Sequence, residues 1–116
     1  MSITYVIQFD VRPSEIDRFR TLLDEVLDAM RHEPNFRNAA LHKDPANPLR
    51  FMLYETWADH EDVMNVQLGR PYRDRWHAAL DQILAGPRAF SIWEPLRSDG
   101  SLSLAVEAEA SLETPC

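Results

Sequence analysis

The sequence predicts an α+β fold in which one antiparallel sheet carries helices on one face, in the ferredoxin-like order β-α-β-β-α-β. Four short segments show the two-residue alternation of strands, and two longer segments show the spacing of amphipathic helices. Each helical segment lies between two strand segments, so the chain divides into two βαβ halves. A chain of 116 residues, 45% hydrophobic and 27% charged, suits one domain with its own core.

The first half begins with a strand and a long helix. Residues 3–11 alternate apolar and polar side chains, which is the period of a strand. Residues 14–32 carry apolar side chains at helical spacing, with acids and arginines opposite them, and this predicts an amphipathic helix that ends before Pro34. The apolar stripe of this helix consists of Ile16, Phe19, Leu22, Leu23, Val26, Leu27 and Met30.

A hairpin is expected after the helix. Residues 36–43 and 49–57 are predicted strands, joined by a segment rich in Asp, Asn and Pro. Side chains two residues apart on a strand point to the same face, so Leu53, Glu55 and Trp57 share one side of the sheet. A carboxylate in such apolar company needs a partner or a ligand, because an unpaired buried charge is costly.

The second half contains a short helix, a longer helix and a final strand. Asp59 is expected to cap the short helix. The longer helix begins near Pro71, which a first helical turn tolerates, and ends at Gly86-Pro87. Residues 89–94 are the predicted final strand. The apolar stripe of the longer helix consists of Tyr72, Trp76, Ala79, Leu80, Ile83 and Leu84.

The composition divides the chain into a domain, residues 1–97, and a C-terminal tail, residues 98–116. The tail contains four acids and no Lys or Arg, so the domain carries only -3 of the net charge of -7. Residues 102–112 alternate apolar and polar side chains as a strand does, although their Ala and Glu content suits a helix equally. We expect part of this tail to pack on a partner subunit or along a sheet edge.

Several classes of function are not expected. The acidic charge argues against binding nucleic acid, which requires a basic surface. No apolar run approaches the ~18 residues of a membrane span, and the first residues lack the features of a signal peptide, so a cytoplasmic location is expected. A single cysteine, Cys116, excludes an internal disulfide and a thiol-based zinc site. No catalytic triad, phosphate loop, metal-ligand spacing or dinucleotide fingerprint is present.

The sheet is predicted to be apolar on both faces. Met52 and Tyr54 lie on the side of the third strand opposite Leu53, and the final strand likewise has Trp93 on one face and Ile92 on the other. Helices cover only one face, so the other needs a second cover. We therefore expect a homodimer that packs through the sheet faces.

Four segments give the chain its resemblance to the antibiotic biosynthesis monooxygenase (ABM) family of dimeric ferredoxin-like α+β barrel proteins. The resemblance extends over about residues 3–96, and the Glu-x-Trp strand is its most distinctive part. The segments are Val11-Arg12-Pro13, Arg31-His32-Glu33-Pro34, Asp44-Pro45 and Phe51-Met52-Leu53-Tyr54-Glu55-Thr56-Trp57-Ala58-Asp59.

The resemblance implies a fold and a range of activities. The family includes cofactor-independent quinol or anthrone monooxygenases, haem-degrading enzymes and an isomerase. Gln67 stands where the haem degraders carry an iron-ligating His, and Leu53 stands where the anthrone oxygenases carry an Asn. Haem degradation is therefore not expected, and no cofactor is expected.

The leading expectation is a cofactor-independent monooxygenase of a phenolic, quinol or anthrone-type aromatic small molecule. One alternative is a non-catalytic ligand-binding or stress-associated domain. Another is an isomerase or decarboxylase of a small metabolite.

Candidate site residues lie on the last helix and on the third strand. Arg73 and His77 are four residues apart and share a helix flank, with Trp76 beside them. If this flank faces Glu55 and Trp57, one pocket holds a proton acceptor (His77), an anion stabiliser (Arg73) and a further catalytic carboxylate (Glu55). The expected substrate-binding walls are Trp57, Trp76, Leu53 and Tyr72.

Each candidate also has a structural interpretation that the sequence leaves open. Glu55 and Arg73 suit an internal ion pair that holds the helix to the sheet. The tryptophans suit the core, and His77 suits a position facing solvent.

Overall fold

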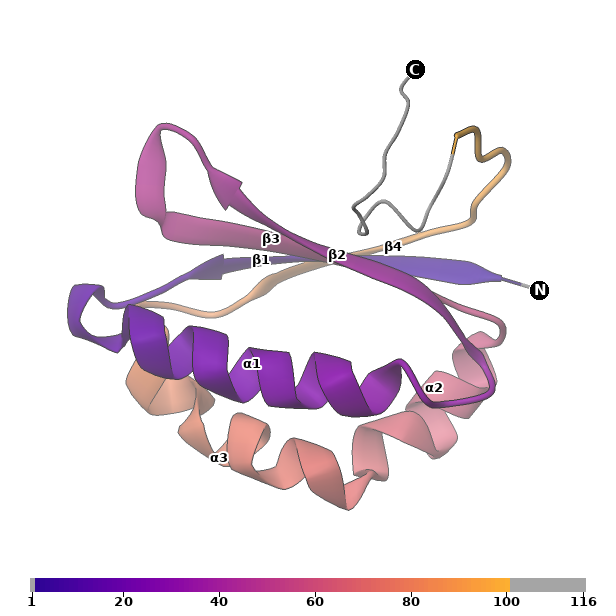
Figure 1. Ribbon diagram of the computed structural model, residues 1–116, viewed down its shortest axis with the longest axis horizontal. Coiled ribbons are helices and arrows are strands. Elements are labelled where there is room, and N and C mark those ends of the chain that lie inside the picture. The colour runs from indigo at the N-terminus through magenta and orange to yellow at the C-terminus, as the bar shows by residue number, and fades with distance from the viewer. Residues whose placement is uncertain (1, 101–116) are drawn as a thin grey trace.

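The computed structural model describes residues 2–100 and shows a four-stranded antiparallel sheet with three α-helices on one face (Figure 1). The sheet order β2-β3-β1-β4 confirms the ferredoxin-like fold. The strands are β1 (Ile3–Asp10), β2 (Phe36–Asp44), β3 (Asn47–Trp57) and β4 (Ala89–Trp93). The helices are α1 (Ile16–Met30), α2 (His60–Asn65) and α3 (Asp74–Ile83), and 3-10 turns occur at Pro13–Glu15, Gln67–Gly69 and Pro71–Arg73.

Both long helices are shorter than the sequence pattern predicts. A 3-10 turn with Pro at its start precedes each of them, because proline fixes φ but has no N–H to donate. Helix α1 ends at Met30 and not at residue 32. The N–H of His32 donates to the carbonyl of Ala29, three residues earlier, and not to that of Asp28 as in an α-helix. The predicted cap of α2 is confirmed, since the carboxylate of Asp59 accepts a hydrogen bond from the N–H of Glu61 at 3.2 Å. Residues 102–112 of the tail lie outside the described residues.

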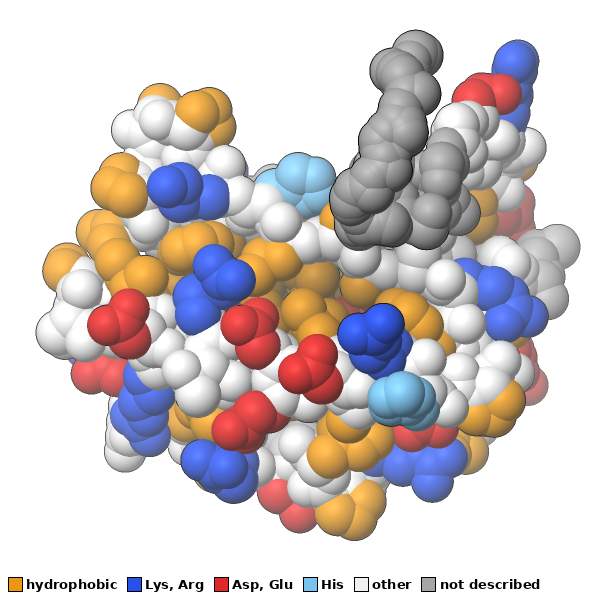
Figure 2. Space-filling model, viewed as in Figure 1, with side chains coloured by type: hydrophobic (Ala, Val, Ile, Leu, Met, Phe, Trp, Pro, Cys, Tyr) orange, Lys and Arg blue, Asp and Glu red, His pale blue; other side chains and the backbone are white. Residues whose placement is uncertain are grey.

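An aromatic cluster joins the sheet to the two long helices. Phe19 of α1 is fully buried and lies 4.8 Å from Phe51, 5.1 Å from Phe9 and 5.8 Å from Trp76, measured between ring centroids. Trp76 of α3 also meets Phe9 edge-on at 5.8 Å. Such contacts add to the free energy of burial. Figure 2 shows hydrophobic side chains between the sheet and the helices and charged side chains over the helix layer.

The sheet alternates as predicted, with one face buried under the helices. On β3, Phe51, Leu53, Glu55 and Trp57 are buried, whereas the residues between them are half-buried on the helix-free face. Strand β1 pairs with β3 so that Tyr5 lies opposite Glu55. Within residues 2–100, no helix is both long and apolar enough to cross a membrane.

Candidate functional site

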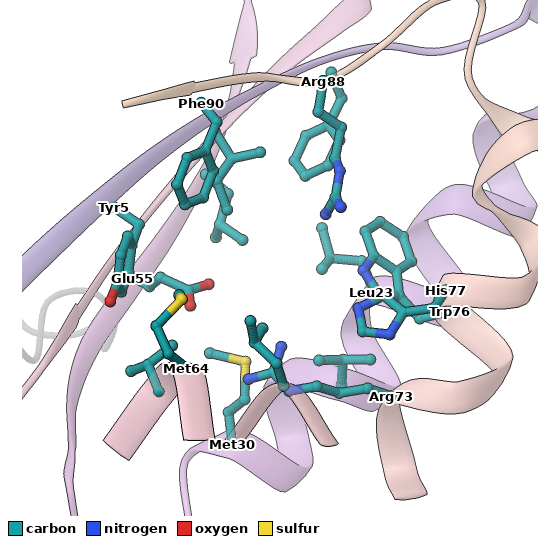
Figure 3. A pocket seen from close by; sticks show the side chains of 16 residues that line it. Tyr5, Leu23, Met30, Glu55, Met64, Arg73, Trp76, His77, Arg88 and Phe90 are labelled. Carbon is teal, nitrogen blue, oxygen red and sulfur yellow. The ribbon is translucent and has the colours of Figure 1, made fainter. Parts of the chain in front are cut away.

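A cavity of about 360 Å³ lies between the sheet and the helix layer (Figure 3). Tyr5, Leu53 and Phe90 line it from the sheet, and Met30 lines it from the end of α1. Val63, Met64 and Leu68, from α2 and the turn after it, also line the cavity. The size and the largely apolar walls are typical of a small-molecule site.

The first polar group of the cavity is the carboxylate of Glu55. Its position on the buried face of β3 leaves the side chain only 7% exposed. The Nε1–H of Trp57 donates a 2.8 Å hydrogen bond to Oε1, which fixes the orientation of the carboxylate. Burial raises the pKa of Glu55, although this hydrogen bond and the nearby cations Arg73 and Arg88 act to lower it.

The second polar group is the guanidinium of Arg73, which lies at the end of the 3-10 turn before α3. Arg73 is 6% exposed, and its Nε and Nη2 atoms are buried without a hydrogen-bond partner. Figure 3 shows this guanidinium and the Glu55 carboxylate directed into the same space. Among the described residues, no ion pair within 4.0 Å joins Glu55 to Arg73. A buried arginine with free donors is costly, and an anionic ligand would satisfy it.

Glu33, just beyond α1, anchors the segment that carries Arg73. Its carboxylate accepts hydrogen bonds from the Nη2 of Arg70 at 3.3 Å and from the hydroxyl of Tyr72 at 3.1 Å. The carboxylate is almost buried, with a side-chain exposure of 12%, so these bonds are poorly screened by solvent. Because both partners of Glu33 lie within three residues of Arg73, the clamp limits how far the guanidinium can move.

His77 and Arg88 complete the polar lining. His77 lies one turn after Arg73 on α3, and it lines the cavity although the residue as a whole is exposed, as one interpretation of the sequence expected. Partial burial, Arg88 and Arg73 lower the pKa of His77, while Asp74 acts to raise it. The imidazole is therefore neutral at neutral pH and able to accept a proton. Arg88 enters from the segment before β4, and its guanidinium points into the cavity (Figure 3).

The structure brings most of the candidate residues together. Glu55, Arg73 and His77 line one cavity, with Leu53 and Trp76 in its walls. Trp57 and Tyr72 do not line it. Trp57 is fully buried behind Glu55 and packs edge-on against Phe36 at 5.3 Å. Tyr72 is half-buried, and its hydroxyl is engaged by Glu33.

Among the lining residues that were not singled out from the sequence as site residues, Arg88, Tyr5 and Phe90 matter most for the chemistry. Arg88 lies in a loop, where the spacing of residues in the sequence does not predict the direction of a side chain. Tyr5 follows the apolar alternation of β1 and looks like core, yet its hydroxyl reaches the Nδ1 of His60 at 2.6 Å. Phe90 stacks on Tyr5 with the ring centroids 5.6 Å apart. The pairing of β4 with β1 could have indicated that Tyr5 and Phe90 are neighbours on the same face of the sheet.

Gln67 does not offer a ligand to the cavity. It is 2% exposed, its Nε2 donates a 3.0 Å hydrogen bond to Asp62, and it is not among the residues that line the cavity. An amide in this position is a poor iron ligand. The residues at this position therefore do not fit a haem site of the kind that the family resemblance suggests.

Comparisons with known proteins agree with this architecture. The sequence profile described as antibiotic biosynthesis monooxygenase matches residues 2–79. The chain belongs to the antibiotic biosynthesis monooxygenase family. It is 31% identical over 93 residues to the candidate monooxygenase GME11364 of Pestalotiopsis microspora, covering 79% of this chain and 78% of that protein.

Solved structures of low sequence identity share the ABM fold. Rv0793 from Mycobacterium tuberculosis superposes with a TM-score of 0.76 at 21% identity, over 86% of this chain and 100% of that one. SnoaB, a cofactor-independent oxygenase from Streptomyces nogalater, superposes with a TM-score of 0.69 at 18% identity, over 84% of this chain and 95% of that one. At these identities the likeness establishes the fold alone.

The buried Nε and Nη2 atoms of Arg73, which have no hydrogen-bond partner, lead to a prediction about stability. We expect Arg73→Met to raise the free energy of unfolding by about 1 kcal/mol, because it removes buried donors that have no partner. Urea denaturation at neutral pH measures the change. Arg75→Met is the matched control, since Arg75 is 76% exposed and pairs with Glu25 outside the cavity. A loss of several kcal/mol for Arg73→Met would instead indicate a structural ion pair with Glu55.

Proposed function

We propose that this protein is a cofactor-independent monooxygenase that oxidises a phenolic, quinol or anthrone-type aromatic small molecule. The observation that carries this proposal is the meeting of a neutral imidazole, a buried guanidinium with free donors and a buried carboxylate in one apolar cavity. Membership of the ABM family and the fold shared with a cofactor-independent oxygenase support the same reaction class.

The three polar side chains take separate roles in the proposed reaction. His77 accepts the proton of a substrate hydroxyl, because its lowered pKa keeps it neutral. Arg73 stabilises the oxygen anion that this step creates, through donors that no protein group uses. Glu55, held in place by Trp57, accepts a hydrogen bond from a second hydroxyl of the substrate. Trp76 and Leu53, which are 4% and 2% exposed, give the substrate ring an apolar wall to pack against.

The electrons for the reaction come from the substrate. Deprotonation makes a hydroquinone ring electron-rich enough to react with O₂ at a ring carbon. One oxygen atom stays on that carbon, and the other leaves as water with two substrate hydrogens, so a hydroquinone and O₂ give a hydroxyquinone and water. The ring is oxidised and O₂ is reduced, and no further reductant is needed.

Oxygen uptake with a panel of hydroquinones and anthrones tests this function. We expect turnover by the wild type and a loss of about 10²-fold or more in kcat for His77→Gln, because the proton acceptor is removed. His32→Gln is the matched control, since His32 is exposed at the end of α1 and lies outside the cavity. Binding of the same compounds without oxygen uptake would overturn the oxygenase and support the binding domain.

The pH dependence follows from the direction of the His77 shift. A base with a lowered pKa stays unprotonated to lower pH, so kcat/KM, which reports the free protein, should rise with pH through a midpoint below 6.5 and then level off. Initial rates of oxygen uptake at low substrate concentration, measured across this pH range, check the midpoint.

We further propose that two copies pack through the helix-free faces of their sheets. In the isolated chain, Val6, Met52 and Tyr54 lie on this face and are only half-buried. Trp93, which pairs with Thr4 on the same face, is 60% exposed. A second copy would cover this apolar surface.

Light scattering tests the dimer. We expect the mass of a dimer at micromolar concentration for the wild type and the mass of a monomer for Tyr54→Arg, because the new charge would be buried at the interface. Phe90→Arg, on the helix side of the sheet, should remain a dimer. A monomeric wild type would contradict the proposal.

A further inference from the structure

The cavity has more positive than negative charge. Its charged side chains are Glu55, Arg73 and Arg88. His77 is neutral at neutral pH because its pKa is lowered, and Tyr5 is neutral because its pKa is raised. Glu55 contributes at most one negative charge, so the two guanidinium groups leave the cavity with a net positive charge of at least one.

The proposed reaction does not use Arg88. Arg73 alone meets the oxygen from which His77 takes the proton, whereas Arg88 enters from another side, in the segment before β4 (Figure 3). No protein carboxylate pairs with Arg88 within 4.0 Å among the described residues. Arg73 is buried with free donors, whereas Arg88 is an exposed residue that lines the same cavity. Two guanidinium groups placed in this way suit a ligand that brings its own anion.

We propose that the substrate is an aromatic carboxylate and that Arg88, together with Arg73, binds the carboxylate group. The inference rests on the proposed function for the aromatic ring and adds the permanent anion. A monoanion is favoured over a phosphate ester, because the Glu55 carboxylate in the same cavity repels a second negative charge.

The proposed roles of these groups also imply an order of substituents on the ring. The carboxylate lies next to the hydroxyl that His77 deprotonates, so that Arg73 contacts both and Arg88 takes the outer oxygen. A second hydroxyl at the far side of the ring donates to Glu55, across the cavity. A 1,4-dihydroxyarene 2-carboxylate has this arrangement.

Calorimetric titration under argon tests the inference without turnover. The probes are 1,4-dihydroxynaphthalene-2-carboxylate and its 2-carboxamide, which has nearly the same shape and no charge. We expect the wild type to bind the carboxylate at least about tenfold more tightly, because hydrogen bonds to charged groups exceed neutral ones by that much. Arg88→Gln should show a reduced preference, because only Arg73 then contacts the carboxylate, while it binds the carboxamide as the wild type does. Arg75→Gln, outside the cavity, should keep the preference.

The outcomes separate this inference from the proposed function. Equal binding of both probes by the wild type, or an unchanged preference in Arg88→Gln, would overturn the assignment of Arg88. Oxygen uptake with neutral hydroquinones would then still support the monooxygenase. Preferred binding of the carboxylate without any oxygen uptake would keep the inference and reject the reaction.

Discussion

The site depends on a buried carboxylate that is held by a hydrogen bond and not by an ion pair. Trp57 donates to Glu55 from two residues along the same strand, so the sheet itself orients the carboxylate toward the cavity. Arg73 faces the same space from the helix layer with buried donors unused. Because Glu55 and Arg73 form no ion pair in the folded protein, both groups are free to interact with a ligand, and these interactions can contribute to its binding free energy.

The surrounding fold keeps the two charges apart. On the sheet side, Glu55 cannot move without breaking its bond to a fully buried tryptophan. On the helix side, Glu33 holds Arg70 and Tyr72, which flank Arg73. The aromatic cluster around Phe19 sets the separation of sheet and helices. With these anchors in place, the cavity between the charges is present before a ligand binds.

The sequence predicted the order of elements and the shared face of Glu55 and Trp57, because strand and helix periods are local properties. It also indicated the flank of Arg73 and His77, which are one helical turn apart. It could not predict whether Glu55 reaches Arg73, since that depends on the distance between layers. Arg88 lies in a loop, and the Tyr5–His60 contact joins residues 55 apart in the chain, so neither has a local pattern.

The pKa of Glu55 in the free protein distinguishes a carboxyl group that faces the cavity from one that is ion-paired with Arg73. A carboxyl group that faces a cavity has a raised pKa because burial dominates, whereas a carboxylate in a direct ion pair with Arg73 has a lowered one. An NMR titration of the side-chain carboxyl carbon, assigned by its loss in Glu55→Gln, measures this value in the free protein. We expect a midpoint above 4.5, and a midpoint below 4.5 would show that Glu55 is instead held as an ion pair.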